Sequence, residues 1–186
     1  MDITDHTFKA GDELAFMPDM RFEACLFQGF DFTLHDLTSV QFVDCTFTAC
    51  KLANLKVLNT LWRRVQFEEC NVMGINWCNA RKMEDVGFLR SKLDFAVFQQ
   101  LDLQRCQIKD CSAREVDFSE ADLRFSILSG TDFSGATFQS TKIAGADFRQ
   151  SRGYVFDLKT TPIQKAKFSL PEAAGLLVAL GAEIDL

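Results

Sequence analysis

The feature that most constrains the fold of this chain is an apolar residue at every fifth position. One series of thirteen such positions runs from Met17 to Trp77, and a second series of thirteen runs from Phe88 to Phe148. Twelve of the 19 phenylalanines occupy these positions, although only 47% of the chain is hydrophobic. A period of five fits neither an α-helix, which repeats every ~3.6 residues, nor a long strand, which alternates every ~2. The sequence therefore predicts a short unit repeated along most of the chain.

Small or compact residues recur two places before these apolar residues, as at Cys45, Cys50, Ala96 and Ala121. In an extended chain, residues two apart point to the same side. Each unit thus predicts a short extended piece with two inward side chains, followed by two residues that turn the chain. Repeated turning in one sense closes a coil, and coils stack on one another in a β-solenoid.

The two series are out of step by one residue. Ala80 fits the spacing of the first series and Met83 fits that of the second, so the extra residue lies near Arg81–Lys82. We interpret this slip, within residues 80–83, as a bulge or bend. A domain boundary is not expected there, because 186 residues suit one domain of ordinary size.

The later units read ADL, SGTDF, SGATF and AGADF, and they closely resemble the A(D/N)Lxx motif of pentapeptide-repeat proteins. The resemblance covers about residues 15–158. It implies an all-β solenoid, a right-handed quadrilateral β-helix with four units in each coil. Residues 1–14 are then expected to form a lead-in, and residues 159–186 a C-terminal module. Residues twenty apart, such as Cys25 and Cys45, are expected to stack on shared faces.

The C-terminal module predicts a short helix followed by a strand. Ser169 and Glu172 form a capping-box pattern, Pro171 suits a first helical turn, and Gly181 suits a helix end. Residues 182–186 are expected to form the strand. The helix either caps a monomer or joins two copies, and the resemblance favours a homodimer. The residues expected at the dimer contact are Leu176, Leu177, Val178, Leu180, Ile184 and Leu186.

Composition excludes several classes of protein. The net charge is -6 and the pI is about 4.9, so direct binding to nucleic acid is not expected, whereas a basic protein surface is a plausible partner. No apolar run suggests a signal peptide or a membrane span. Seven cysteines without a CxxC pair predict reduced, buried thiols and a cytoplasmic protein, with neither disulfides nor a zinc site.

An enzyme is not expected. The chain has no GxxxxGK[ST], GxGxxG, HExxH or GxSxG motif, and two histidines cannot easily supply several acid–base roles. A regular solenoid also offers few deep pockets, which enzymes need. We therefore expect no catalytic residues, no cofactor and no metal, and we look for function on the outside of the rod.

The outer surface suggests a substitute for duplex DNA. Asp102 and Asp122 are twenty residues apart and are expected to stack on one face, with further acidic residues nearby. The residues expected to form an acidic partner-binding face are Asp102, Asp117, Glu120, Asp122, Asp132 and Asp147. Yet each half of the chain has the same charge balance, and outward aspartates also arise from solvation alone, so a scaffold rod with an unrelated protein partner remains the alternative.

Continuous repeats, the one-residue slip and the tail PEAAGLLVALG are similar to the quinolone-resistance (Qnr) and microcin-immunity branch of the family. That resemblance implies a dimeric DNA mimic that binds DNA gyrase or topoisomerase IV and protects it from a quinolone or a peptide toxin. The chain lacks an insertion long enough to form the projecting loops of the Gram-negative Qnr proteins. The resemblance therefore favours topoisomerase binding over quinolone protection, within a general role in antibiotic resistance or immunity.

Overall fold

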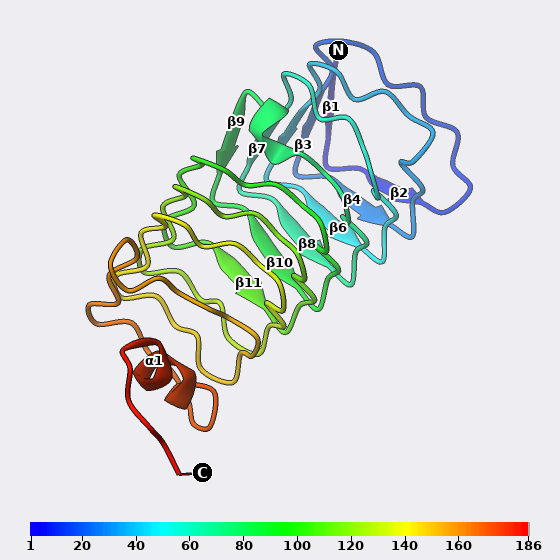
Figure 1. Cartoon of the computed structure of the whole chain (residues 1–186). Coiled ribbons are helices and arrows are strands. Elements are labelled where there is room, and N and C mark those ends of the chain that lie inside the picture. Colours follow the sequence, from blue (N-terminus) through cyan, green and yellow to red (C-terminus); the bar gives the residue numbers. More distant parts are fainter. Residues whose placement is uncertain (186) are drawn as a thin grey trace.

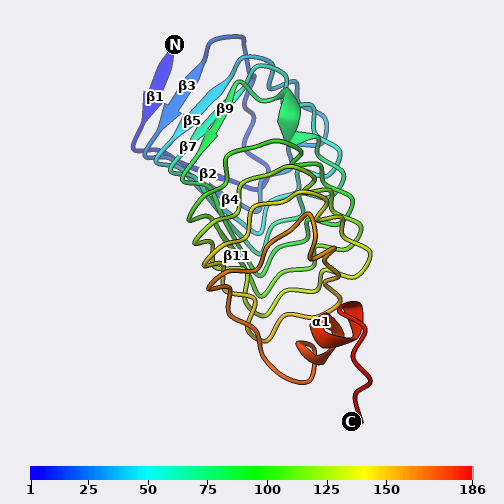
Figure 2. The same ribbon diagram turned by 60° about the vertical axis from the view of Figure 1, so that its left-hand side comes forward.

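Short parallel strands stack along two faces of a continuous coil. The computed structural model describes residues 1–185, and Figures 1 and 2 show a rod with the N-terminus at one end and the C-terminal helix at the other. Face 1 holds the five-stranded sheet β1 (Asp2–Thr4), β3 (Arg21–Glu23), β5 (Gln41–Val43), β7 (Leu61–Arg63) and β9 (Lys82–Glu84). Face 2 holds β2 (Thr7–Lys9), β4 (Leu26–Gln28), β6 (Thr46–Thr48), β8 (Gln66–Glu68), β10 (Gly87–Leu89) and β11 (Gln107–Lys109).

The other two sides of the coil are held by isolated parallel bridges. Face 3 includes the bridge between Asp31 and Lys51, and face 4 the bridge between Asn76 and Val97. Successive partners on each face lie about twenty residues apart, so each coil contains four units. The predicted parallel β-solenoid with four sides is confirmed.

The residues at every fifth position form the core, as their spacing predicts. Phe22, Phe42 and Trp62 stack along face 1, with ring centroids 5.3 and 4.5 Å apart, and none of the three is exposed. Phe47 and Phe67 stack on face 2 at 4.9 Å. Because rings one coil apart lie face to face, each coil covers the apolar surface of the next, and the solenoid needs no second layer to bury its core.

The compact residues two places earlier also satisfy backbone groups at a corner of the coil. Buried Thr131 accepts a hydrogen bond from the amide of Cys111 at 3.2 Å and donates one to the carbonyl of Ile108 at 2.9 Å. Ser91 does the same for the amide of Cys70, at 3.0 Å. Hydroxyls and thiols here therefore replace ladder partners for buried backbone groups, which are costly to leave unpaired.

The register slip lies where the sequence predicts it. Leu61 pairs with Lys82, a step of one more residue than the twenty that separate Gln41 from Leu61. The extra residue follows a 3-10 turn, η1 (Trp77–Asn79), and the amides of Arg81 and Lys82 both donate to the carbonyl of Thr60, at 2.8 and 3.4 Å.

The N-terminal boundary differs from the expected one. Residues 1–14 are not merely a lead-in, because β1 and β2 lie within them and pair with β3 and β4. The first fivefold series also begins too early, since Met17 is 51% exposed while Phe16 packs against the core. The reason is a second register change: Asp2 pairs with Arg21, a step of nineteen residues.

The C-terminal module contains a shorter helix than expected and no strand in the described residues. α1 (Ala174–Ala179) begins after Ala173 without a side-chain cap. The predicted capping box is wrong, because the Ser169 hydroxyl instead accepts a hydrogen bond from the amide of Gln150. Residues 182–185 form no strand, and Leu186 lies outside the described residues. The helix does end just before Gly181, whose φ is +88°.

Six of the seven cysteines are buried, as predicted, and Cys78 is exposed. Burial is the main cause of a pKa of about 12 for the thiols of Cys45 and Cys106. No disulfide joins cysteines within residues 1–185. In the same part of the chain, no helix combines the length and hydrophobicity that a bilayer crossing requires.

Candidate functional surface

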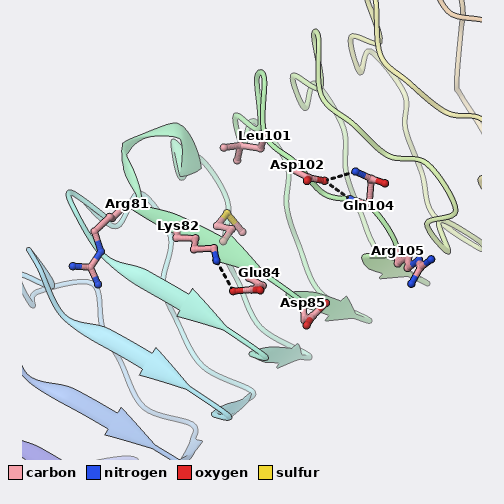
Figure 3. A pocket seen from close by; sticks show the side chains of 9 residues that line it. Arg81, Lys82, Glu84, Asp85, Leu101, Asp102, Gln104 and Arg105 are labelled. Atoms are coloured by element: carbon pink, nitrogen blue, oxygen red, sulfur yellow. Dashed lines mark hydrogen bonds and ion pairs between the residues drawn. The ribbon is translucent and has the colours of Figure 1, made fainter.

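In the described residues, no group of three or more histidine, cysteine, aspartate or glutamate side chains is arranged to hold a metal ion. One open cleft, of about 570 Å³, lies on face 1 between β9 and residues 101–105 (Figure 3). Its walls carry both acidic and basic side chains. The candidate sites are therefore outer faces of the rod, and the six predicted acidic residues can be placed on them individually.

The six predicted acidic residues do not share one face. Asp102 and Asp122 do stack, joined by a parallel bridge on face 1, as the twenty-residue spacing predicts. Asp132 bridges to Arg152 on face 3, whereas Asp147 bridges to Lys167 on face 2. Asp117 lies on face 4, where it bridges to Thr137, and Glu120 lies at the corner that follows. The predicted face is therefore spread around the whole rod, because successive units turn onto successive faces.

Arginine side chains hold two of these carboxylates along their own strands. Arg124 Nη2 lies 2.6 Å from Asp122 Oδ2, and Arg149 Nη2 lies 2.6 Å from Asp147 Oδ2. The hydrogen bond from Arg149 is the main reason that the pKa of Asp147 lies below its ordinary value. In both cases the aspartate stands on the bridged piece and the arginine begins the turn that follows, where its amide also donates to the same carboxylate, at 3.2 and 3.1 Å.

Asp132 is the most firmly held carboxylate of the six. It is 8% exposed, and its Oδ2 accepts from Arg114 Nε at 2.9 Å and from Arg152 Nη2 at 3.0 Å. Burial opposes its ionisation, but hydrogen bonds from Ser134 and the two arginines outweigh that effect and hold its pKa well below the ordinary value. This carboxylate fastens three coils together and offers little free charge to a partner.

Three of the six carboxylates form no ion pair in the described residues and lie on adjacent faces. Gln99 donates to Asp117 and Gln100 donates to Glu120, while Asp102 accepts from Gln104 on the next face. The face 4 segments 96–100, 116–120 and 136–140 contain neither lysine nor arginine. We call Asp102, Asp117 and Glu120 the acidic corner, since they gather where face 4 turns into face 1.

The sequence contains signals that could have separated the carboxylates paired with arginine from those without an ion pair. The pattern Asp-x-Arg at residues 122–124 and 147–149 places opposite charges two residues apart in the sequence. Asp132 is twenty residues from Arg152, so the same coil length that stacks Asp102 on Asp122 also predicts an ion pair there. The sequence signal for the cleft is weaker and consists of the register slip. The slip predicts a local change in the coil but does not show which face opens.

The C-terminal module presents a small apolar patch. Leu177, Val178 and Leu180 are 52%, 57% and 68% exposed, whereas Leu176 is 8% exposed and packs against the core. Ile184 is half-buried. Of the residues predicted to join two copies, Leu176 therefore covers the end of the rod. Leu177, Val178 and Leu180 remain exposed and available to a partner.

Comparison with known proteins supports the repeat assignment. Residues 117–152 match the family described as pentapeptide repeats, in eight copies. No curated protein sequence matches the chain.

Among solved structures, two trypsin-treated forms of QnrB1, described as a plasmid-mediated fluoroquinolone resistance protein, are similar. One has a TM-score of 0.66 at 18% identity, covering 100% of both chains; the other has a TM-score of 0.65 at 18% identity, covering 100% of this chain and 98% of that one. Full-length QnrB1 has a TM-score of 0.52 at 17% identity, covering 98% of this chain and 100% of its own. At this identity the likeness concerns the fold. Residues 117–152 therefore match pentapeptide repeats, and the chain has a β-solenoid fold like that of QnrB1.

Proposed function

We propose that this chain binds DNA gyrase, or the related topoisomerase IV, as a substitute for duplex DNA and protects the enzyme from a poison such as a quinolone or a peptide toxin. The observation that carries the proposal is the similarity of the fold, over the full length of both chains, to QnrB1, a fluoroquinolone resistance protein. The chain itself acts by binding and catalyses no reaction.

The shape and charge of the rod support this mode of binding. Coils stack at the spacing of β-strands, ~4.8 Å, so outward side chains repeat regularly along the axis. Duplex DNA carries one charge per ~1.7 Å, far more than this rod. The chain therefore imitates DNA through its narrow shape and through the acidic corner, which meets part of a basic DNA-binding surface. Electrostatic attraction of this kind weakens as salt rises.

Pairing of two copies through the C-terminal module would lengthen this surface. Leu177, Val178 and Leu180 form an exposed apolar patch at the end of the rod, and the predicted contact also includes Ile184 and Leu186. Burial of such a patch between two copies is the closed, symmetric arrangement most common in homo-oligomers. The double variant Leu177→Glu/Val178→Glu should sediment as a monomer where the parent sediments as a dimer.

A reducing compartment fits the chain. Its cysteines are unpaired in the described residues, although disulfides are the usual means of strengthening proteins outside the cytoplasm. Cytoplasmic location is also what binding to a topoisomerase requires.

The test is DNA supercoiling by gyrase, with and without a poison, across a titration of the protein. Protection of supercoiling, or its inhibition in the absence of poison, supports the proposal, and either effect should weaken as salt rises. The variant Asp102→Asn/Asp117→Asn/Glu120→Gln should lose most of the effect. The matched control Asp2→Asn/Asp5→Asn/Glu13→Gln removes three charges near the N-terminus and should retain it. No effect on gyrase or topoisomerase IV at micromolar protein would contradict the proposal.

One observation favours a second function. The spread of the six carboxylates over all four faces, with three of them tied to arginine, is also what a scaffold rod would show. A protein partner bound equally well by the parent and by the acidic-corner variant, with little dependence on salt, would support the scaffold.

A further inference from the structure

The ladder of face 1 is interrupted once along the rod. Strands β1, β3, β5, β7 and β9 pair in succession, and the next bridge on this face joins Asp102 to Asp122. No bridge joins β9 to residues 101–105 in the described chain. The other three faces stay paired at this level, through Gly87 with Gln107 on face 2, Lys92 with Ser112 on face 3 and Val97 with Asp117 on face 4. The rod is thus open on one side only.

Two amide groups lose their partners at this opening. In regular coils, the amide of Asp44 donates to the carbonyl of Arg63 at 2.9 Å, and that of Asp122 donates to Leu101 at 2.9 Å. The equivalent amides of Asp85 and Asp102 donate no backbone hydrogen bond within the described residues. Both edges of the opening therefore present free strand groups, which pair readily with another extended chain.

The opening has the size and lining of a binding cleft. Its volume is about 570 Å³, within the range of ~300–1,000 Å³ typical of ligand sites. Leu101 lines the cleft and is half-exposed, whereas the residue at the equivalent position one coil later, Ala121, is fully buried. The buried side chains of Met83 and Leu103 lie on the inward side of the two edges. An apolar side chain is therefore the complement of the cleft's inner side.

The mouth of the cleft carries charges of both signs, with Glu84 and Asp85 on the β9 edge and Asp102 and Arg105 on the opposite edge. Figure 3 shows Glu84, Asp85 and Asp102 around the middle of the cleft, while Arg81 points away from it on one side. Lys82 already forms an ion pair with Glu84 at 2.7 Å. Asp85 and Asp102 form no ion pair within the described residues, and neither does Arg105 on the opposite edge, so the carboxylate of Asp85 on the β9 edge remains available to a cation of a segment paired with that edge.

We propose that this cleft binds an extended peptide segment of a partner protein, which pairs as an additional strand with the free edge of β9. The segment has an apolar residue directed inward, between Met83 and Leu103, followed by arginine or lysine beside Asp85. Backbone pairing supplies affinity, and the inward and outward side chains supply selectivity, as in other cases of strand addition. This binding mode goes beyond the proposed function and does not depend on which partner supplies the segment.

A copy of residues 59–66 of the chain, as a fluorescein-labelled peptide, is a suitable probe. In the fold this segment contains β7, which pairs with the opposite edge of β9 and places Arg64 near Glu84 and Asp85. Fluorescence anisotropy should show saturable binding to the full chain. Hydrogen exchange should slow at the amides of Asp85 and Asp102 by about tenfold or more, and the amide of Asp44 should be unaffected.

Two controls identify the site. A peptide with Arg63→Glu and Arg64→Glu should bind about tenfold more weakly or worse, which corresponds to ~1.4 kcal/mol. The protein variant Asp85→Lys/Asp102→Lys should lose affinity for the probe by a similar factor. The matched variant Asp2→Lys/Asp5→Lys changes the same unit positions on face 1 at β1, and Asp5 and Asp85 share a φ of 52°. It should bind as the parent does.

Several outcomes would overturn the inference. One is the absence of saturable probe binding up to millimolar concentration, and another is protection of the amides of Asp85 and Asp102 already in the free protein. Equal loss of binding in the two matched variants would place the probe at the end of the rod or in a nonspecific electrostatic complex. None of these results depends on a topoisomerase, so the proposed function is tested separately.

Discussion

The two ends of the solenoid build the same coil from different side chains. Before the register slip, faces 1 and 2 are ladders of three-residue strands, and the inward column of face 1 is aromatic up to Trp62. After the slip, face 1 continues as isolated bridges, and its inward residues are Leu103, Leu123 and Ile143. The coil therefore depends on an apolar residue at each fifth place, and the size of that residue can vary from face to face.

The two ends also differ in how far they resemble the family motif. The match to the family covers residues 117–152, where alanine, serine or threonine stands two places before the apolar residue and aspartate often stands one place before it. The N-terminal coils pair in the same parallel register, but there cysteine, valine or methionine often stands two places before the apolar residue. The motif is thus one solution to packing at the corner of the coil, and a bulkier corner is compatible with the same fold.

The largest expected effect concerns the aromatic column before the slip. Phe67 is fully buried and lies within 6 Å of the ring centroids of Phe47 and Trp77, at 4.9 and 5.8 Å. Phe67→Ala should destabilise the protein by about 3–5 kcal/mol, because the cavity cannot collapse between fixed coils. Urea unfolding followed by circular dichroism measures this loss.

The counterpart in the second half is Leu123→Ala, which should cost about 2–3 kcal/mol because a smaller side chain is removed. A larger loss of unfolding free energy for Leu123→Ala than for Phe67→Ala would show that the aromatic column is not the more strongly packed region.

The next effect concerns the ion pairs that join coils in the second half. Asp132→Asn should destabilise the protein by about 1.5–3 kcal/mol at pH 7, since hydrogen bonds to a charged group are lost. The folded pKa of Asp132 lies below the unfolded one, so its contribution is complete above about pH 4 and is lost as the pH falls towards the folded value. The difference between parent and variant should therefore shrink in acid.

Unfolding measured from pH 7 down to pH 3 tests this dependence. The control is Asp102→Asn, an exposed aspartate without an arginine partner in the described residues, which should change stability by no more than about 0.5 kcal/mol. A loss that stays constant in acid for Asp132→Asn would show that its charge is not the stabilising feature.

A smaller effect concerns the hydrogen-bonded corner. Thr131→Val keeps the shape of the side chain but leaves the amide of Cys111 and the carbonyl of Ile108 without their partner. The expected cost is about 1–2 kcal/mol. Thr137→Val, at an exposed place on face 4, should be nearly neutral. Equal changes in the two variants, measured by urea unfolding, would show that the corner needs only compact side chains.

The sequence predicts the coil and the slip, because both follow from which residues must be buried, whereas the four sides were expected from the resemblance to pentapeptide-repeat proteins. Leu176 was predicted less well, since a position in a short terminal helix has no periodic neighbours to fix its direction. The exposure of Cys78 could have been predicted, because it directly follows Trp77, whereas each buried cysteine stands two places before an apolar residue of the fivefold series. The acidic residues were assigned to one face because Asp102 and Asp122 are twenty residues apart and the others lie nearby in the sequence, although units five residues apart turn onto different faces. The ion pair of Asp132 with Arg152 follows from their twenty-residue spacing, whereas its contact with Arg114, eighteen residues away, needed the structure.

The central claim is that one extra residue in the chain interrupts the pairing of face 1, while the other three faces of the rod stay paired. Deletion of Arg81 tests this claim most directly, because it restores the twenty-residue step between Leu61 and its partner on β9. In the parent, hydrogen exchange should be fast at the amides of Asp85 and Asp102 and slow at those of Asp44 and Asp122. In the deletion variant all four should exchange slowly, and the peptide probe should no longer bind. If the first two amides remained fast in a folded deletion variant, the extra residue would not be the cause of the opening.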